Sequence, residues 1–243
     1  MSVKKKKTRT VTLVLVVRNE ERGLGEMLPK IPLNIYKDVF AIDGNSKDRT
    51  RDILRDAGIR TYVQKSPGLG AAMLEARQYV KTDSFIFFHP DGNENPEDLD
   101  GMAGILRDGA DFVVASRMIR GAWNEEDEKI LKWRKWANIG FAVLANLFFA
   151  HNGNKTTDVT NGFRGISTDA FDRMRLSSVD LTMDYQMVIR ALKLNIRITE
   201  FPTREGERIG GNTNFPSMST GIAELKLLGR EIKMGRRTAR GAQ

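Results

Sequence analysis

Residues 84–97 constrain the fold more than any other stretch of this chain. The segment opens with four consecutive apolar residues, 85–88, three of which are Phe. An apolar run without polar alternation is typical of a strand that is buried on both faces of a helix-covered parallel sheet. The polar turn His-Pro-Asp-Gly-Asn-Glu follows at once, and Pro96 then suits the first turn of a helix. Because ligands of open α/β sheets bind outside the carboxyl ends of the strands, we expect functional groups in this turn.

The rest of the chain alternates predicted strands with predicted helices. We expect strands at 11–17, 38–43, 60–64, 85–88, 111–116 and 196–201, and a short strand after a loop at 158–165. We expect helices at 23–31, 71–80, 127–150, 184–194 and 217–234, and one that ends near residue 57. This order predicts an α/β fold with a mostly parallel, Rossmann-like sheet flanked by helices.

The length of 243 residues fits one large α/β domain better than two small ones. We divide the chain into a basic tail at 1–10, the domain at 11–216, and an amphipathic helix with a basic tail at 217–243.

Carboxylates follow three of the predicted strands, at Glu20, Asp43 and Asp91. If the strands are parallel these groups meet at one edge of the sheet, where paired carboxylates commonly bind a divalent cation and substrate phosphates. The glycines Gly68 and Gly70 precede a predicted helix, whose N-terminal amides would suit a phosphate. The alternative is that Asp43 and Asp91 simply cap the helices that follow them.

The charge balance indicates an anionic partner. The formal net charge is +8, with basic residues concentrated at both ends, and nucleotide phosphate, lipid head groups and nucleic acid all fit this balance. Nucleic acid is disfavoured because the basic residues are not interleaved with stacking aromatic residues. The absence of Cys excludes disulfides and thiolate sites and fits a reducing compartment. We find no signal peptide and no apolar run of about 20 residues, so we expect a cytoplasmic protein that associates with membranes only peripherally.

Five motifs, taken in order, resemble those of the family 2 glycosyltransferases with the GT-A fold. They are Val-Arg-Asn-Glu-Glu at 17–21, Asp-Gly-Asn-Ser-Lys-Asp-Arg-Thr at 43–50, Gly-Leu-Gly-Ala-Ala at 68–72, Ala-Ser-Arg at 115–117 and Asp-Val-Thr-Asn-Gly-Phe-Arg at 158–164. The dolichyl-phosphate (polyprenyl-phosphate) mannosyltransferase branch is the most similar. The resemblance implies an inverting transferase that uses a nucleoside diphosphate sugar, based on UDP or GDP.

The resemblance also implies roles for individual residues. The predicted donor-binding residues are Arg18, Asn19, Glu20, Asp43, Asn45, Ser46, Gly68, Gly70 and Asn214. The predicted ligands of a divalent metal, Mn²⁺ or Mg²⁺, are His89, Asp91 and Asn93. The predicted catalytic residues are Asp91, Arg117, Arg134, Asp184 and Arg208.

The chain departs from the family pattern at two positions. His89 stands where the family has the first aspartate of its Asp-x-Asp motif, and imidazole suits Mn²⁺ better than Mg²⁺, which prefers oxygen ligands. Asn214 stands where the family has a lysine that contacts the diphosphate, which leaves Arg208 to stabilise the leaving group.

Two kinds of acceptor remain open. A polyprenyl phosphate is already anionic and needs no general base, and Arg117 and Arg134 would then hold its phosphate. A saccharide hydroxyl needs a base, for which Asp184 is the candidate. The predicted helix at 127–150 is basic and contains Trp in its first half and is apolar in its second, a pattern that suits either an anionic membrane surface or packing in the core. The family resemblance favours the membrane surface. A sugar-nucleotide binding module without catalysis is a further alternative.

Overall fold

The computed structural model describes residues 8–124, 127, 132–209 and 217–235. Its single seven-stranded sheet has the order β3-β2-β1-β4-β6-β5-β7. The strands are β1 Val11–Val17, β2 Asp38–Asp43, β3 Arg60–Val63, β4 Ser84–Phe88, β5 Phe112–Ser116, β6 Arg164–Ser167 and β7 Ile198–Pro202. The helices are α1 Glu21–Met27, α2 Thr50–Asp56, α3 Leu69–Arg77, α4 Asp98–Arg107, α5 Trp133–Phe149, α6 Thr168–Met174, α7 Met183–Lys193 and α8 Ser217–Lys233.

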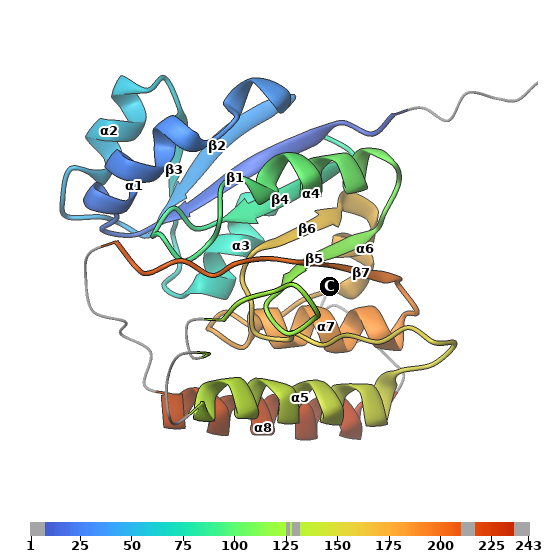
Figure 1. Ribbon diagram of the computed structural model, residues 1–243. Helices are drawn as coiled ribbons and strands as arrows, with labels where there is room; N and C mark the ends of the chain where they lie inside the picture. The colour runs from blue at the N-terminus through green and yellow to red at the C-terminus, as the bar shows by residue number, and fades with distance from the viewer. Residues whose placement is uncertain (1–7, 125–126, 128–131, 210–216, 236–243) are drawn as a thin grey trace, which may run out of the picture.

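Helices cover both faces of the sheet (Figure 1). Every residue of β1 and of β4 is buried, which confirms the prediction from the apolar runs. Alternate side chains of β1 enter two separate cores, because successive strand residues point to opposite faces. Leu13 and Leu15 pack with α1, α2 and α4, whereas Val14 and Val16 belong to the core that includes α3, α6 and α7. The predicted α/β class is therefore confirmed.

The strands that carry the predicted site run parallel. Strand β1 pairs in parallel with β2 on one side and with β4 on the other, so the three strands end at one edge of the sheet. Strand β6 is antiparallel to both of its neighbours, β4 and β5. A strand in that direction begins where its neighbours end, so the loop that precedes β6 also lies at this edge. Strand β7 is parallel to β5, and the segment after Pro202 leaves the sheet at the same edge.

Several element boundaries differ from those predicted. The helix expected at 23–31 is α1 followed by a 3-10 turn, Leu28–Lys30, because Pro29 has no amide hydrogen with which to continue an α-helix. The helix expected at 127–150 is α5, which begins at Trp133. Asp127 instead closes a turn, in which its side chain accepts a hydrogen bond from the amide of Asn124. The helix α6 was not predicted.

Helices α5 and α8 lie side by side on the outer side of α7 (Figure 1). The carboxylate of Glu231 in α8 is fully buried and forms ion pairs with two cations of α7, with Arg190 at 3.0 Å and with Lys193 at 2.5 Å. This charged cluster fixes α8 to the domain. None of the described helices combines the length and the apolar character that crossing a membrane requires.

Candidate active site

Two carboxylates and one guanidinium group meet at the carboxyl edge of the sheet. Glu20 follows β1 and Asp91 follows β4, its parallel neighbour. Arg208 joins them, donating from Nη2 to Oε1 of Glu20 at 2.5 Å and from Nη1 to Oδ2 of Asp91 at 2.6 Å. Burial and the charge of Asp91 raise the pKa of Glu20 to about 7, although Arg208 opposes them. The predicted convergence of Glu20 and Asp91 is confirmed.

The backbone holds Arg208 above these carboxylates. The backbone amide of Gly206 donates to the carbonyl oxygen of Asn93 at 2.9 Å. The backbone amide of Ile209 donates to the carbonyl oxygen of Asp91 at 2.6 Å. Gly92 lies beneath this crossing with φ of +99°, and a Cβ atom there would come within 2.5 Å of the carbonyl oxygen of Glu207. The segment after β7 therefore lies directly on the turn after β4.

His89 and Glu94 form a second polar pair in the same turn. The two oxygens of Glu94 engage the backbone amide and the ring Nδ1 of His89, each at 2.7 Å. Burial lowers the pKa of His89, but the carboxylates of Glu94 and Asp91 outweigh it and raise this pKa to about 9. Two atoms of this turn are buried without a hydrogen-bond partner, Nε2 of His89 and Oδ1 of Asn93.

The predicted nucleoside-binding loops after β1 and β2 are tied to each other. The amide of Asn19 donates to Oγ of Ser46 at 2.9 Å, and Oδ1 of Asn19 accepts from the amide of Lys47 at 2.8 Å. Asp43 is fully buried behind this connection and accepts from Oγ of Ser46 at 2.5 Å. Arg18, Asn19 and Asn45 are exposed in front of it. Asp43 thus shapes these loops from behind, while the exposed residues lie where a ligand can reach them.

The glycine loop before α3 is explained by packing against the chain before α7. A Cβ atom on Gly68 would lie 2.1 Å from the carbonyl oxygen of Val179, and one on Gly70 would lie 2.4 Å from that of Ser178. The amide of Gly70 already donates to the carbonyl of Asp180 at 3.2 Å. The sequence predicted a phosphate here because the N-terminal amides of α3 would lack partners. The amide of Gly70 already has a partner within the protein, so it does not support that prediction.

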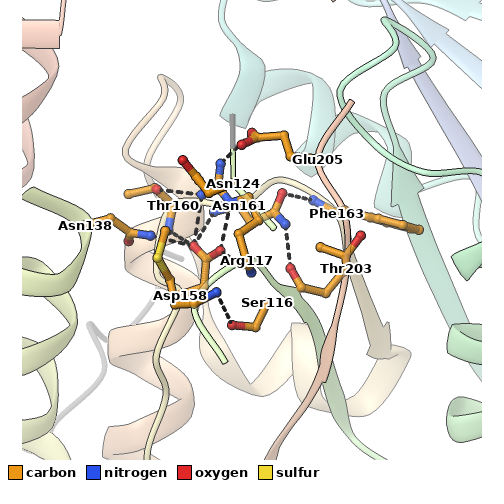
Figure 2. A network of polar contacts seen from close by, with 12 residues as sticks. Ser116, Arg117, Asn124, Asn138, Asp158, Thr160, Asn161, Phe163, Thr203 and Glu205 are labelled. Atoms are coloured by element: carbon orange, nitrogen blue, oxygen red, sulfur yellow. Dashed lines mark hydrogen bonds and ion pairs between the residues drawn. The ribbon is translucent and has the colours of Figure 1, made fainter. Parts of the chain in front are cut away.

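Arg117 is the centre of a buried polar network at the ends of β5 and β6 (Figure 2). Its guanidinium group donates to both oxygens of Asp158, at 2.8 Å and 3.0 Å, and to Glu205 at 2.9 Å. Burial favours protonation of Asp158, but Arg117 outweighs it and lowers the pKa of Asp158 to about 2. Asn138 of α5 also donates to Asp158, at 2.8 Å. The network therefore links α5 to the loop before β6 and to the segment after β7.

The remaining catalytic candidates lie on α5 and α7. Arg134 is half-buried in the first turn of α5, one helical turn before Asn138 and so on the same side of the helix. Asp184 lies in the first turn of α7, where its Oδ1 is buried without a hydrogen-bond partner and lies 3.5 Å from Nε of Arg164. Burial raises the pKa of Asp184, against the opposing charge of Arg164. Asn214 lies outside the described residues.

Sequence reasoning missed four residues that build this site. Glu94 orients His89, and Asn138, Asp158 and Glu205 complete the network around Arg117. Asp158 and Glu94 lie within motifs that the sequence shows, so they could have been included. Asn138 and Glu205 carry no local signal, because their role depends on how α5 and the segment after β7 pack.

The turn after β4 offers donors for a divalent cation. Asp91 supplies a carboxylate, and the buried Oδ1 of Asn93 and Nε2 of His89 have no protein partner. Among the described residues no group of three His, Cys, Asp or Glu side chains is placed to hold a metal ion. A divalent cation here would therefore need the side-chain amide oxygen of Asn93 and oxygen atoms of a substrate as further ligands. Substrate phosphates commonly supply such ligands. The residues present fit such an ion.

Known proteins share sequence and fold with this chain. The profile of glycosyl transferase family 2 matches residues 12–175. A relative is "Glycosyltransferase AglJ" of Haloferax volcanii, which is 26% identical over 223 residues that cover 90% of this chain and 71% of that protein. Another is "Dolichol-phosphate mannosyltransferase" of Pyrococcus furiosus, which is 20% identical over 216 residues that cover 84% of this chain and 59% of that protein.

A solved structure shares the fold. Glucosyl-3-phosphoglycerate synthase of Mycobacterium tuberculosis, in complex with Mn²⁺ and UDP-glucose, aligns with a TM-score of 0.68. The alignment covers 90% of this chain and 79% of that one at 18% sequence identity. The predicted family and the GT-A fold are thus confirmed, and the relatives are consistent with the predicted dolichyl-phosphate branch. The chain belongs to glycosyl transferase family 2 and is a glycosyltransferase.

Proposed function

We propose that this chain transfers a sugar, with inversion, from a UDP or GDP sugar to a polyprenyl phosphate at a membrane surface. The observation that carries the proposal is the contact of Arg208 with both Glu20 and Asp91 at the carboxyl edge of the sheet. The guanidinium group of Arg208 thus lies where the diphosphate of a bound donor would need positive charge to balance its own negative charge. The dolichol-phosphate mannosyltransferase among the relatives supports the choice of acceptor.

On the donor side, the exposed Arg18, Asn19 and Asn45 would contact the nucleoside. Asp91, Asn93 and His89 would hold the divalent cation, which supplies positive charge to the diphosphate. Arg208 would leave its two carboxylates and donate to the phosphate oxygens instead. Its planar fork suits bidentate contact with either kind of anion, so this exchange of partners keeps the number of charge-assisted hydrogen bonds.

The transfer itself needs little proton chemistry if the acceptor is a lipid phosphate. An acceptor oxygen forms a bond to the anomeric carbon as the bond from that carbon to the diphosphate breaks, and the nucleoside diphosphate leaves with the electron pair. The acceptor phosphate is already ionised at neutral pH, so no base has to remove a proton. The protein must align the two substrates and stabilise the charge on the leaving group.

The two acceptor-side arginines are assigned different roles. Arg117 has ion pairs to Asp158 and Glu205, so we assign it to positioning the loop before β6 and the segment after β7. Arg134 is half-buried one helical turn before Asn138, which belongs to this network, and we assign it to the phosphate of the acceptor. The resemblance implies an acceptor-side role for both cations, and the ion pairs of Arg117 support our assignment of different roles to them.

Helices α5 and α8 offer a surface for the membrane. Exposed apolar side chains form a stripe at helical spacing on α5, at Trp133, Trp136, Ile139, Val143 and Leu147. A matching stripe on α8 consists of Met218, Ile222, Leu225 and Ile232. The exposed cations Lys226, Arg230 and Lys233 flank the α8 stripe. We call these two stripes the α5/α8 face. An apolar face bordered by cations suits an anionic bilayer, where each cation near the surface contributes about 1 kcal/mol.

Substitution of Leu147, which is 73% exposed, with Glu is expected to weaken binding to vesicles of phosphatidylglycerol and phosphatidylcholine by at least about tenfold. The reason is that the variant loses burial of an apolar side chain and adds a charge that the anionic surface repels. Co-sedimentation with vesicles measures the effect. Val63→Glu, at an exposed apolar position of β3 away from this face, is the matched control and should bind like the wild type. Equal binding of L147E and wild type, or a dimer that buries this face, would contradict the proposal.

Sugar transfer can be tested with UDP and GDP sugars, Mn²⁺ and a short-chain polyprenyl phosphate. We expect the labelled sugar to enter the lipid fraction and nucleoside diphosphate to be released only when the lipid phosphate is present. The anomeric configuration of the product, read by NMR, should be opposite to that of the donor. Absence of transfer with every donor, or retention of configuration, would refute the proposal.

A saccharide hydroxyl is the second candidate acceptor. The buried carboxylate of Asp184 favours it, because a hydroxyl acceptor needs a general base. Its Oδ1 is buried without a hydrogen bond, and burial raises the pKa of this carboxylate, which favours its acceptance of a proton. In this case Asp184→Asn should abolish transfer to a saccharide. If the acceptor is a lipid phosphate, transfer needs no base and the same variant should retain it.

A further inference from the structure

The segment 203–209, which follows β7, carries Arg208 across the carboxyl edge of the sheet. Its later residues lie on the turn after β4. Its first residue is tied to the end of β5, because the amide of Thr203 donates to the carbonyl oxygen of Ser116 at 3.0 Å. Glu205 lies between these two ends, so its side chain can fix the part of the segment that leads to Arg208.

The side chain of Glu205 is turned inward, to Arg117. It is only 11% exposed, and its Oε1 accepts from Nη1 of Arg117 at 2.9 Å (Figure 2). Asp158 occupies the other side of the same guanidinium group, where its two oxygens accept from Nε at 2.8 Å and from Nη2 at 3.0 Å. Arg117 therefore joins the segment that carries Arg208 to the loop before β6.

Arg117 is held in place from the side of Asp158. This carboxylate is fully buried, and its pKa of about 2 keeps it ionised at neutral pH. Its loop is fixed in turn by Glu200 of β7, which accepts from the amides of Thr157 at 2.8 Å and of Asp158 at 3.2 Å. A cation fixed in this way sets the position of Glu205. One cation beside two carboxylates also leaves a net negative charge, which would repel an acceptor phosphate.

We propose that Glu205 is a positioning residue for Arg208, and that Arg117 acts through it on the leaving group of the donor instead of holding the acceptor phosphate. The inference rests on the proposed function, which assigns Arg208 to the diphosphate. Glu205 and Arg208 are three residues apart, at most about 10 Å of extended chain. An anchor this close limits where the guanidinium group can move once it leaves Glu20 and Asp91. Such control matters because a misplacement of about 1 Å can lower a rate by about 10²-fold.

Replacement of Glu205 with Ala is expected to lower kcat/KM for the sugar nucleotide by about 10- to 100-fold and to weaken binding of UDP or GDP with Mn²⁺. Steady-state kinetics and calorimetry measure the two effects. Glu205→Gln keeps an oxygen that can accept from Arg117, so it should recover part of the loss. Glu207→Ala removes an exposed carboxylate from the same segment and should behave like the wild type. Unchanged kcat/KM and nucleotide affinity in E205A would overturn the inference.

A double-mutant cycle with Arg208→Ala separates positioning from damage to the fold. In the R208A background there is no guanidinium group to position, so E205A should change nucleotide affinity little and the two effects should be non-additive. A merely structural effect would appear in full in both backgrounds. Thermal melts of each variant without nucleotide show that it is folded. Additive effects on nucleotide affinity would contradict the inference.

The KM values show which substrate Arg117 serves. Lys cannot form the planar fork that Arg117 uses to contact both carboxylates, so Arg117→Lys should act like E205A. Both variants should raise KM for the sugar nucleotide and leave KM for the polyprenyl phosphate unchanged. A raised KM for the lipid in either variant would mean that Arg117 holds the acceptor phosphate, which would refute the inference.

The outcomes separate this inference from the proposed function. Non-additive effects on nucleotide binding without sugar transfer would leave the role of Glu205 standing and remove the proposed reaction. Sugar transfer to the lipid phosphate with additive effects would do the opposite. Absence of nucleotide binding in the wild type would overturn both.

Discussion

Replacement of Arg208 with Ala is expected to lower kcat by about 10²- to 10³-fold, the usual loss when one preorganised donor to a developing charge is removed. Arg208 is the guanidinium group that contacts both Glu20 and Asp91, and we propose that it turns to the diphosphate when the donor binds. The contact already forms in the bound donor complex and strengthens as charge develops on the leaving group. The variant should therefore lose kcat, and it should lose kcat/KM by a larger factor because KM for the donor also rises.

Two further variants make this prediction specific. Arg208→Lys keeps the charge but loses the planar fork, so it should recover part of the lost rate. Arg173→Ala removes an exposed arginine of α6 that pairs with Asp169 and should leave kcat unchanged. A nucleotide titration of R208A should show that the site still binds the donor. A kcat of R208A within threefold of the wild type would mean that the activation free energy changes by roughly 0.6 kcal/mol or less. Arg208 would then not stabilise the leaving group.

Replacement of Glu231 with Ala is expected to lower the free energy of unfolding by about 3–5 kcal/mol. The carboxylate is fully buried between Arg190 and Lys193, which are themselves 1% and 0% exposed. Its removal leaves two buried cations without a counter-charge, which costs far more than the loss of an exposed ion pair. Urea unfolding followed by circular dichroism measures the change.

Asp169→Ala is the matched control for this cluster. Asp169 pairs with Arg173 on the surface of α6, where both side chains are more than half exposed, so its loss should cost less than about 1 kcal/mol. A loss in E231A as small as that in the control would show that the buried cluster does not hold α8 in place. Because α8 forms half of the α5/α8 face, we also expect E231A to bind anionic vesicles less tightly.

The sequence predicted the parts of the fold and site that depend on local pattern. Strands β1 and β4 are unbroken apolar runs, and Glu20 and Asp91 follow them directly, so their convergence needed only the rule that parallel strands end at one edge. Arg208 lies 117 residues beyond Asp91, and its contact with that residue could be expected only through the family resemblance.

Features that depend on packing could not be predicted in this way. The antiparallel direction of β6 places Asp158 beside Arg117, and no periodicity in the sequence encodes that direction. The glycines before α3 suggested a phosphate site, yet Gly70 is required by its close approach to the carbonyl of Ser178. The cluster of Glu231 with α7 is equally hidden, because three charged residues on two amphipathic helices would ordinarily be placed in solvent.

The most direct test of the account is a crystal structure of the chain with UDP or GDP and Mn²⁺. We predict the diphosphate at the carboxyl edge of β1 and β4, beside Asp91, with the guanidinium group of Arg208 moved from the two carboxylates to the phosphate oxygens. A nucleotide bound elsewhere, or bound at this edge while Arg208 still bridges Glu20 and Asp91, would contradict it.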